Sequence, residues 1–567
     1  MLNRRQGEDI LSSDSLKALF SDLIINWMDI IIFIRSRNCR NYSFPAIYCH
    51  LLILFLSCKL LLCSNTKVRK CQSRYYDKKE NIVCICNATY CDNIPEVGNL
   101  QSLQAVIYKT DQRGKRFERT VSSFTEKTDE AGIIRLKIDS QIRFQTIIGF
   151  GGAFTDAAGI NIDSLSEPTR ANLLQSYFGN KGIQYTIGRV PIASTDFSTH
   201  AYSYDDSPND FTLSNFSLAN EDFKFKIPYI KQAASLTGGI LKLFGSPWSA
   251  PGWMKTTGLM IGGGTLRGPP NGSYHVTWAN HYVKFLEAYK NNGITFWGLT
   301  VQNEPVTGVD LSYKWQTMYF NPKTERDFIK NHLGPTLRRS EVGRNISLMI
   351  MDDQRSQLPI WADVVLKDKE AAQYVSGIAV HWYSDFVPVS QLSKTHNRHP
   401  NKFIIGSEAC TGSKPFEHSP ILGDWSRGDM YAHDIIQDLS HWVSGWTDWN
   451  LCLDLKGGPN FAKNYVDAPI IVNATADEFY KQPMFYILGH FSKFIPPGSV
   501  RIDLHFYLKP ISYEGIAFVT PTHQRVLVLL NRGNKSVTFS IEDRSKDDIS
   551  LRIQLEPKSI ATIIWNK

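Results

Sequence analysis

Between residues 145 and 450 the chain repeats one pattern eight times: a strand-like run of β-branched and apolar residues, a turn, and a longer stretch with helical spacing. In one such stretch, Tyr282, Phe285 and Tyr289 fall on a single helical face. The strand-like runs cover 146–150, 184–189, 240–244, 296–301, 347–351, 377–380, 402–406 and 445–449. Eight alternating units of this kind predict a (β/α)8 TIM barrel. An open doubly wound sheet is the main alternative, but Gly149-Phe-Gly-Gly does not continue as a dinucleotide-binding glycine motif.

The two flanks of this region have a different pattern. Residues 98–144 and 499–567 contain short runs in which apolar and polar side chains alternate. Alternation with period two predicts antiparallel strands that pack as a β-sandwich. Strands from both ends must meet in space to share one domain. We therefore predict a β-sandwich domain formed from both chain ends, with the barrel at 145–498 inserted between them and a small-sheet segment inserted near 451–482.

The first part of the chain has the features of a secretion leader. Residues 46–63 are strongly apolar and follow several arginines, as in the hydrophobic region of a signal peptide. We assign residues 1–67 to this signal and leader region. A retained membrane anchor is the alternative, although the apolar run is marginal in length and Lys59 interrupts it.

A cluster of cysteines follows the leader in residues 68–97: Cys71, Cys84, Cys86 and Cys91. An even number of closely spaced cysteines behind a secretion signal predicts disulfides that staple a small β segment. Four cysteines allow three pairings, and a zinc site is disfavoured because no histidine accompanies them. Six glycosylation sequons that follow the leader also favour a secreted glycoprotein: Asn87, Asn215, Asn271, Asn345, Asn473 and Asn534.

The net charge of +8 lies mostly in the leader, where residues 1–70 carry ten basic and five acidic side chains. The rest of the chain is close to neutral, and its composition has no basic block typical of nucleic-acid binding. The chain's 14 histidines would gain charge below about pH 6.5. In an acidic compartment the surface would therefore become cationic, which favours anionic lipids.

Two glutamates end the fourth and seventh strand-like runs: Glu304 in Leu-Thr-Val-Gln-Asn-Glu-Pro and Glu408 in Phe-Ile-Ile-Gly-Ser-Glu-Ala-Cys. In a barrel, such positions face each other at the carboxyl ends of the strands, where barrel enzymes keep their chemistry. Paired carboxylates about 5–5.5 Å apart cleave glycosidic bonds with retention. We expect Glu304 to be the acid/base, with a pKa raised by burial and by its neighbour, and Glu408 to be the nucleophile. A structural role is the alternative, since glutamate before proline is also favoured at a helix start.

Motifs along residues 71–567 carry a resemblance to a known family. They include Gly149-Phe-Gly-Gly-Ala-Phe-Thr-Asp, Ser246-Pro-Trp, Asn303-Glu-Pro, Ser407-Glu-Ala-Cys and Gly445-Trp-Thr-Asp-Trp-Asn. The chain resembles glycoside hydrolase family 30, and within it the lysosomal glucosylceramidases of animals. The resemblance implies a barrel with a split β domain, the disulfides Cys71–Cys84 and Cys86–Cys91, and the same roles for Glu304 and Glu408.

The resemblance also implies a set of residues around the two carboxylates. Those expected to bind substrate are Asp196, Trp248, Asn303, Tyr383, Trp449 and Asn464. Arg189 and His381 are expected behind them, with Arg189 lowering the pKa of the nucleophile. Structural alternatives are a core position for Trp449, a satisfied core histidine for His381 and a helix cap for Asp196.

The implied activity is retaining hydrolysis of glucosylceramide to glucose and ceramide at lysosomal membrane surfaces. The implied partners are glucosylceramide in membranes, anionic lipids and a saposin-type activator, with no nucleic acid, metal or organic cofactor. Two other functions stay open on the residues alone. One is a related activity of the family, such as β-xylosidase or β-1,6-glucanase, and the other is a secreted sugar- or lipid-binding protein without catalysis.

Overall fold

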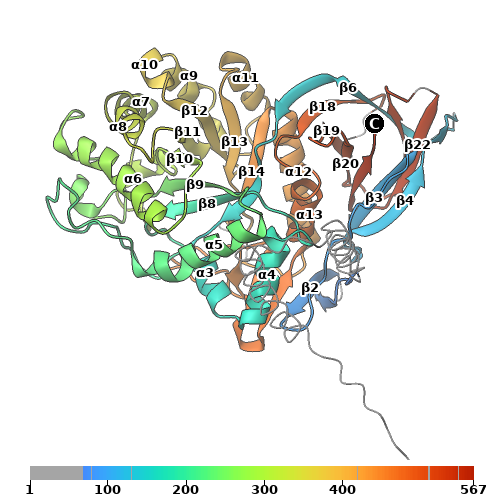
Figure 1. Cartoon of the computed structure of the whole chain (residues 1–567), viewed down its shortest axis with the longest axis horizontal. Helices are drawn as coiled ribbons and strands as arrows, with labels where there is room; N and C mark the ends of the chain where they lie inside the picture. Colours follow the sequence, from blue (N-terminus) through green and yellow to red (C-terminus); the bar gives the residue numbers. More distant parts are fainter. Residues whose placement is uncertain are drawn as a thin grey trace, which may run out of the picture. The chain divides into compact units, whose positions relative to one another are not determined.

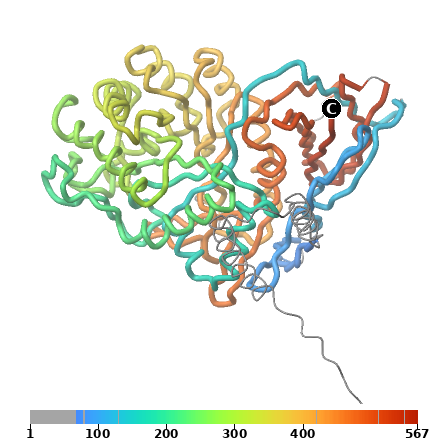
Figure 2. The backbone as a smooth tube through the Cα atoms, in the orientation of Figure 1, coloured from blue at the N-terminus to red at the C-terminus, as the bar shows by residue number. Residues whose placement is uncertain are grey.

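The computed structural model describes residues 68–567, except for 78, 79, 129, 415, 418, 509, 510 and 547 (Figures 1 and 2). The predicted leader at residues 1–67, and with it the choice between a signal peptide and an anchor, lies outside the described residues. Within the described part of the chain, no helix combines the length and apolarity needed to cross a membrane.

The predicted barrel is present. Eight parallel strands close on themselves in chain order: β7 (Gly149–Ala153), β8 (Ile187–Ile192), β9 (Lys242–Pro247), β10 (Gly298–Thr300), β11 (Ser347–Gln354), β12 (Val375–His381), β13 (Phe403–Glu408) and β14 (Val443–Asn450). The first strand begins three residues later than predicted, because residues up to Thr146 continue a strand of the neighbouring β domain. At Gly151 a Cβ atom would stand 2.0 Å from the carbonyl oxygen of Ile187, so close pairing of β7 and β8 requires glycine there.

Helices lie outside the barrel strands (Figure 1). They are α3 (Asp156–Asp163), α4 (Glu167–Phe178), α5 (Ile227–Leu236), α6 (Ser273–Asn291), α7 (Pro322–Phe328), α8 (Gly334–Arg339), α9 (Ile360–Leu366), α10 (Lys369–Ala372), α11 (Ser390–Arg398), α12 (Trp425–Ser440) and α13 (Pro483–Ser492). On α6 the buried face contains Tyr282, Phe285 and Tyr289, as the helical spacing predicted. Their burial fixes which side of α6 faces the barrel.

The β-sandwich is built from both ends of the chain, as predicted. Its ten strands form one continuous sheet in the order β4-β3-β23-β20-β19-β18-β6-β21-β22-β5. They are β3 (Gln104–Asp111), β4 (Glu118–Ser123), β5 (Thr125–Glu126), β6 (Ile134–Thr146), β18 (Val500–Phe506), β19 (Tyr513–Val519), β20 (Arg525–Asn531), β21 (Val537–Asp543), β22 (Ile549–Leu555) and β23 (Ser559–Trp565). Early strands β3 and β6 pair with late strands β23, β18 and β21, so blue and red segments run together in Figure 2. The sheet encloses its own apolar core, which includes Leu136, Leu529 and Trp565.

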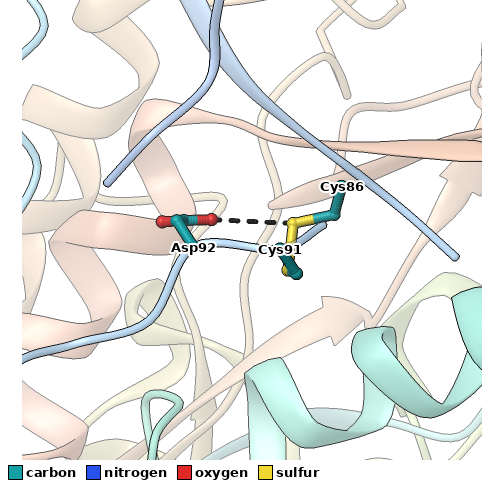
Figure 3. A group of neighbouring side chains, drawn as sticks. All are labelled: Cys86, Cys91 and Asp92. Atoms are coloured by element: carbon teal, nitrogen blue, oxygen red, sulfur yellow. Dashed lines mark hydrogen bonds between the residues drawn. A yellow bond between two sulfur atoms is a disulfide. The ribbon is translucent and has the colours of Figure 1, made fainter. Parts of the chain in front are cut away.

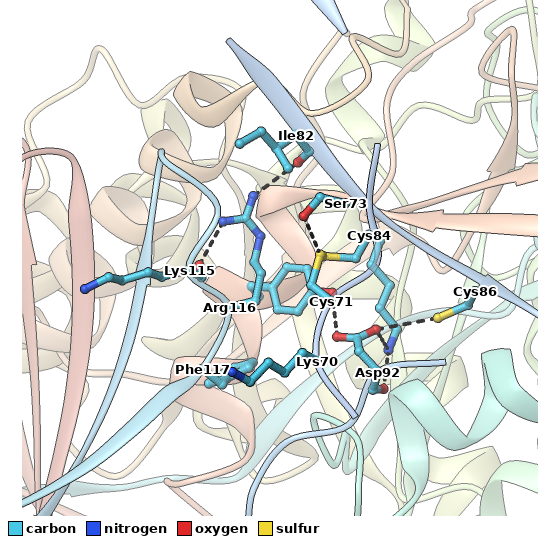
Figure 4. Close-up of a disulfide and its surroundings, with 12 residues drawn as sticks. Lys70, Cys71, Ser73, Ile82, Cys84, Cys86, Asp92, Lys115, Arg116 and Phe117 are labelled. Carbon is cyan, nitrogen blue, oxygen red and sulfur yellow. Dashed lines mark hydrogen bonds and ion pairs between the residues drawn. A yellow bond between two sulfur atoms is a disulfide. The ribbon is translucent and has the colours of Figure 1, made fainter. Parts of the chain in front are cut away.

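A five-stranded sheet joins the cysteine-rich segment to the barrel. Its order is β1-β2-β17-β16-β15, with β1 (Ser73–Tyr76), β2 (Asn81–Asn87), β15 (Leu453–Asp454), β16 (Ile470–Asn473) and β17 (Glu478–Lys481). The disulfides Cys71–Cys84 (Figure 4) and Cys86–Cys91 are both present, which is the pairing that the resemblance implied. Because β2 pairs directly with β17, the stapled segment completes a sheet that the barrel supplies only in part.

Asp92 anchors this junction. Figure 3 shows it beside the Cys86–Cys91 disulfide, where the Cys86 sulfur lies 3.6 Å from a carboxylate oxygen. The same carboxylate is 2.9 Å from the Lys481 ammonium and accepts a hydrogen bond of 2.7 Å from the Tyr486 hydroxyl. Arg116 of the sandwich donates to the carbonyl of Ile82 (Figure 4) and lies over the Tyr486 ring. The stapled segment, the sandwich and the barrel therefore meet in one buried polar cluster.

Candidate active site

The two predicted carboxylates meet at the carboxyl ends of the barrel strands. Glu304 follows β10, the fourth barrel strand, and Glu408 is the last residue of β13, the seventh. A carboxylate oxygen of each, together with a ring nitrogen of His381, lies within 4.8 Å of the others. Such a short gap leaves no room for a water molecule and a sugar between the carboxylates, and it suits direct attack by one of them.

The backbone at Glu304 is unusual. Its φ of 41° places it in the left-handed region, immediately before the 3-10 turn Pro305–Val309. A non-glycine residue in this region costs about 1–3 kcal/mol, which the surrounding structure must supply. The Glu304 N–H donates to the carbonyl of Asp352 at 2.9 Å, and the side chain makes no capping hydrogen bond to the turn. The alternative that Glu304 serves only to start a helix is therefore not what the structure shows.

Each carboxylate has its own partners. The Nδ1 atom of His381 lies 3.1 Å from Glu304 Oε1, and Gln354 donates to the same oxygen at 2.9 Å. Arg189 donates to Glu408 Oε2, and the Tyr383 hydroxyl donates to Oε1 at 2.9 Å. Glu408 thus faces a permanent cation, whereas Glu304 faces a histidine and an amide.

A residue that the sequence did not predict joins these partners. Asp352 accepts hydrogen bonds from Arg189 Nη2 at 2.8 Å and Thr300 Oγ1 at 2.7 Å on one oxygen. Its other oxygen accepts from Ser407 Oγ at 2.6 Å and lies 3.0 Å from His381 Nε2. The signal in the sequence was the polar run Asp352-Asp-Gln-Arg at the end of a strand, which gives no indication of which aspartate points inward.

Burial and the neighbouring charges shift the pKa values of this group. Burial alone would lower the pKa of His381, but Glu408, Asp352 and Glu304 raise it to about 10, so the imidazole is a cation. Burial raises the pKa of Glu408, and His381 and Arg189 offset this only in part. Arg189 does lower the pKa of Glu408, as expected, but the cost of desolvation is larger, so the net shift is upward.

Asp196 and two tryptophans form one wall of the site. Asp196 is 3% exposed and accepts hydrogen bonds from Asn464 at 3.0 Å and from Asn460 at 3.1 Å. Burial raises its pKa to about 7, and the two amides oppose the shift. Trp248 and Trp449 stack with ring centroids 5.1 Å apart. Asn460 was missed by the sequence reasoning, which had no reason to distinguish it from other loop asparagines.

These residues surround a single cavity of about 620 Å³. Its walls include eight predicted residues: Asp196, Trp248, Asn303, Glu304, Tyr383, Glu408, Trp449 and Asn464. Arg189 and His381 are 0% and 1% exposed and lie behind the wall, in contact with the carboxylates. The structure therefore brings together every residue that the sequence singled out for the site.

Two groups of described residues have spacing that could hold a metal ion. In the first, Cys86 and Cys91 are joined as a disulfide and cannot act as thiolate ligands beside Asp92. The second is Glu304, His381 and Glu408. There the cationic imidazole has no free lone pair for a metal, His381 already contacts Glu304, and Glu408 already accepts hydrogen bonds from Arg189 and Tyr383.

Comparisons with known proteins agree with this geometry. Residues 147–495 match the Glycosyl hydrolase family 30 TIM-barrel domain, and residues 498–563 match the Glycosyl hydrolase family 30 beta sandwich domain. Putative glucosylceramidase 4 of Caenorhabditis elegans is 49% identical over 86% of this chain and 94% of its own length. Lysosomal acid glucosylceramidase of Mus musculus is 47% identical over the same shares.

A solved structure gives the same result. The crystal structure of SrfJ from Salmonella typhimurium is similar with a TM-score of 0.75 and 30% identity, over 82% of this chain and all of that one. The two domain matches, the identity to curated relatives and the paired glutamates at the barrel mouth lead to one conclusion. The chain belongs to glycosyl hydrolase family 30 and is a retaining glycoside hydrolase.

Proposed function

We propose that this enzyme is a β-glucosidase that hydrolyses glucosylceramide to glucose and ceramide, with Glu304 as acid/base and Glu408 as nucleophile. The observation that carries the proposal is the carboxylate pair within 4.8 Å at the ends of the fourth and seventh barrel strands. Relatives named glucosylceramidases, 47–49% identical over most of the chain, support the choice of substrate.

In the first step, a carboxylate oxygen of Glu408 attacks the anomeric carbon. The bond from that carbon to the ceramide oxygen breaks, and this oxygen takes the proton of Glu304. Ceramide leaves, glucose remains as an ester of Glu408, and Glu304 is now ionised. Arg189 and Tyr383 hold Glu408 for this attack through their hydrogen bonds to its two oxygens.

In the second step, the ionised Glu304 accepts a proton from water. The water oxygen attacks the anomeric carbon from the side that ceramide has left, and the bond to Glu408 breaks. Glucose is released with its original β configuration, and both glutamates return to their starting states. No group outside the protein and water is needed to balance either step.

The sugar-binding roles follow from the positions of the polar groups on the wall. Asn303 lines the cavity, and its side-chain oxygen accepts from Arg189 at 2.8 Å, so its amide N–H groups are the part of the side chain that can donate to the sugar 2-hydroxyl. The Asp196 carboxyl group can exchange hydrogen bonds with sugar hydroxyls, with Asn460 and Asn464 fixing its position. The rings of Trp248 and Trp449 offer apolar faces to the C–H groups of glucose.

Exposed apolar side chains on the loops after the barrel strands support action at a membrane surface. They are Leu259 after β9, Val309 and Leu311 after β10, Phe386 after β12, Phe416 after β13 and Leu455 after β14. Phe386, which is 87% exposed, also lines the cavity. We propose that this apolar rim enters the lipid around the substrate, in the lysosome, assisted by anionic lipids and a saposin-type activator. A relative named lysosomal supports the compartment.

The test is turnover of a panel of fluorogenic β-glucosides, β-xylosides and β-1,6-linked diglucosides, followed by glucosylceramide in vesicles. Preference for the β-glucoside and release of ceramide support the proposal, whereas preference for the xyloside or the diglucoside would replace it with another activity of the family. A cyclitol epoxide should label Glu408, read by peptide mass spectrometry. Glu408→Gln should abolish both turnover and labelling, and labelling at another residue would contradict the assigned nucleophile.

A further inference from the structure

Asp352 lies at the centre of the catalytic network without reaching the cavity. Its side chain is fully buried and is not part of the cavity wall. The four side chains that contact its carboxylate come from four different barrel strands: Arg189 from β8, Thr300 from β10, His381 from β12 and Ser407 from β13. This carboxylate therefore fixes the relative positions of strands that carry both glutamates.

The backbone of β11 is distorted to place Asp352 there. Met351 and Asp352 both have left-handed conformations, with φ of 73° and 50°, and the register with β12 shifts between Met351 and Asp353. The bulge turns Asp352 toward the barrel interior, while the side chain of Asp353 accepts the backbone N–H groups of Val306 and Gln354. Two adjacent non-glycine residues in this region persist only where the surrounding contacts favour them.

The charges around Asp352 balance in a specific way. Arg189 and the cationic His381 contribute two positive charges, and Asp352 contributes one negative charge, which leaves a surplus of one positive charge. We propose that Asp352 is the fixed counter-ion of this network, which positions Arg189 and His381 and so favours one negative charge, not two or none, on the Glu304–Glu408 pair. This inference rests on the proposed function of the two glutamates.

One negative charge is what both stages of the reaction require. Before attack, Glu408 is ionised and Glu304 holds a proton. In the glycosyl-enzyme, Glu408 is an ester without charge and Glu304 is ionised. The network is therefore neutral in both stages, because the charge passes from one glutamate to the other while Asp352 stays ionised. A buried network that stays neutral avoids the large cost of an unpaired charge.

Other acidic groups near the network do not disturb this balance in mildly acidic solution. Glu325 on α7 accepts the N–H of Met351 at 3.1 Å, and Asp353 and Asp196 interact electrostatically with Glu304. Burial raises the pKa of each of these three carboxyls to about 7, so they hold protons below that pH. Asp352 differs from them because Arg189, His381 and Ser407 lower its pKa against the effect of burial.

The substitution Asp352→Asn tests the proposal. It removes the counter-charge and leaves two cations beside the glutamates, which favours ionisation of both. The glutamate pair should then give up its shared proton at lower pH, so the basic limb of kcat/KM should move down by about one pH unit or more. Ser407→Ala is the matched control, because it removes one hydrogen bond to Asp352 without changing charge. It should leave the midpoint of the basic limb in place, whatever its effect on rate.

The assay compares two β-glucosides across pH, one with a methylumbelliferyl leaving group and one with a dinitrophenyl leaving group. The dinitrophenolate group leaves without a proton from an acid, so cleavage of that substrate does not need Glu304 as the acid. Asp352→Asn should shift the basic limb for the first substrate and affect the second much less. An unshifted limb, or equal losses on both substrates, would overturn the role of Asp352. If even the unaltered enzyme cleaves neither glucoside, the proposed function fails instead.

A second variant covers the case in which Asp352→Asn does not fold. His381→Gln removes one cation, so the network no longer favours an ionised glutamate. The acid limb, which reports ionisation of Glu408, should then move to higher pH, opposite to the shift expected for Asp352→Asn. An acid limb that stays in place or moves to lower pH would overturn the charge balance that the proposal requires.

Discussion

Asp92→Ala should be among the most destabilising single substitutions outside the active site. Asp92 pairs with the ammonium of Lys481, which is 2% exposed and 2.9 Å away, and it accepts the Tyr486 hydroxyl at 2.7 Å. Removing one partner of a buried ion pair costs about 3–5 kcal/mol, since the other charge is left unpaired. If half of this cost appears in the unfolding rate, thermal inactivation should be about tenfold faster or more.

The assay is the rate of thermal inactivation of the protein, because an equilibrium free energy is poorly defined for a chain with several domains and disulfides. The double substitution Asp92→Ala with Lys481→Met is the control, since it removes both charges and should recover most of the loss. Burial lowers the pKa of Lys481, and Asp92 raises it. In Asp92→Ala the lysine therefore loses its proton more easily, and the difference in inactivation rate from the unaltered protein should become smaller at high pH. Equal instability of the single and double variants at all pH values would refute the ion-pair explanation.

Three further outcomes follow from other parts of the structure. Tyr383→Phe removes a hydrogen bond to Glu408, the proposed nucleophile. A hydrogen bond to a charged group is worth about 1.5–3 kcal/mol, so kcat/KM on β-glucosides should fall by about tenfold or more, with the fold intact by circular dichroism. Burial raises the pKa of Asp385 to about 11 and that of Asp438 well above its usual range, so the folded state holds protons that the unfolded state releases above about pH 4. The free energy of unfolding should therefore fall as the pH rises from about 4 toward the pKa values of these two carboxyls in the folded state. Asp438→Asn should make the melting temperature less dependent on pH. Phe386→Ser should weaken hydrolysis of glucosylceramide in vesicles while leaving a soluble glucoside almost unaffected, and an equal loss on both would contradict a lipid contact.

The parts of the fold that could be predicted are those that depend on the local spacing of apolar residues along the chain. Each barrel strand is a short apolar run, and α6 shows its buried face in the spacing of Tyr282, Phe285 and Tyr289. Once the barrel is inferred, its closure alone brings the ends of the fourth and seventh strands together. The convergence of Glu304 and Glu408 thus required no knowledge of side-chain packing, and their pairing could be inferred from the sequence.

The features of the site that could not be predicted depend on local backbone conformation and on how deeply a side chain is buried. Asp352 and Asp353 are adjacent and chemically identical, and only the left-handed bulge decides that the first points inward. The sign of the pKa shift at Glu408 depends on how far burial outweighs two nearby cations, which no spacing reveals. Sequence reasoning could therefore identify the paired glutamates but not the aspartate that joins their partners.

The barrel and the sandwich also depend on each other more than their separate patterns suggested. The sandwich strand β6 ends at Thr146 and the barrel strand β7 begins at Gly149, so the two domains share almost no linker. All residues of α13 are buried, and its His490 lies between Thr562 of β23 and Thr110 of β3 at 2.8 Å from each hydroxyl. Burial lowers the pKa of His490 to about 3, so it stays neutral even in acid. The sandwich therefore buries the outer side of α13, the last barrel helix. Because this contact uses β3 from the start of the chain and β23 from its end, strands from both ends must come together beside α13.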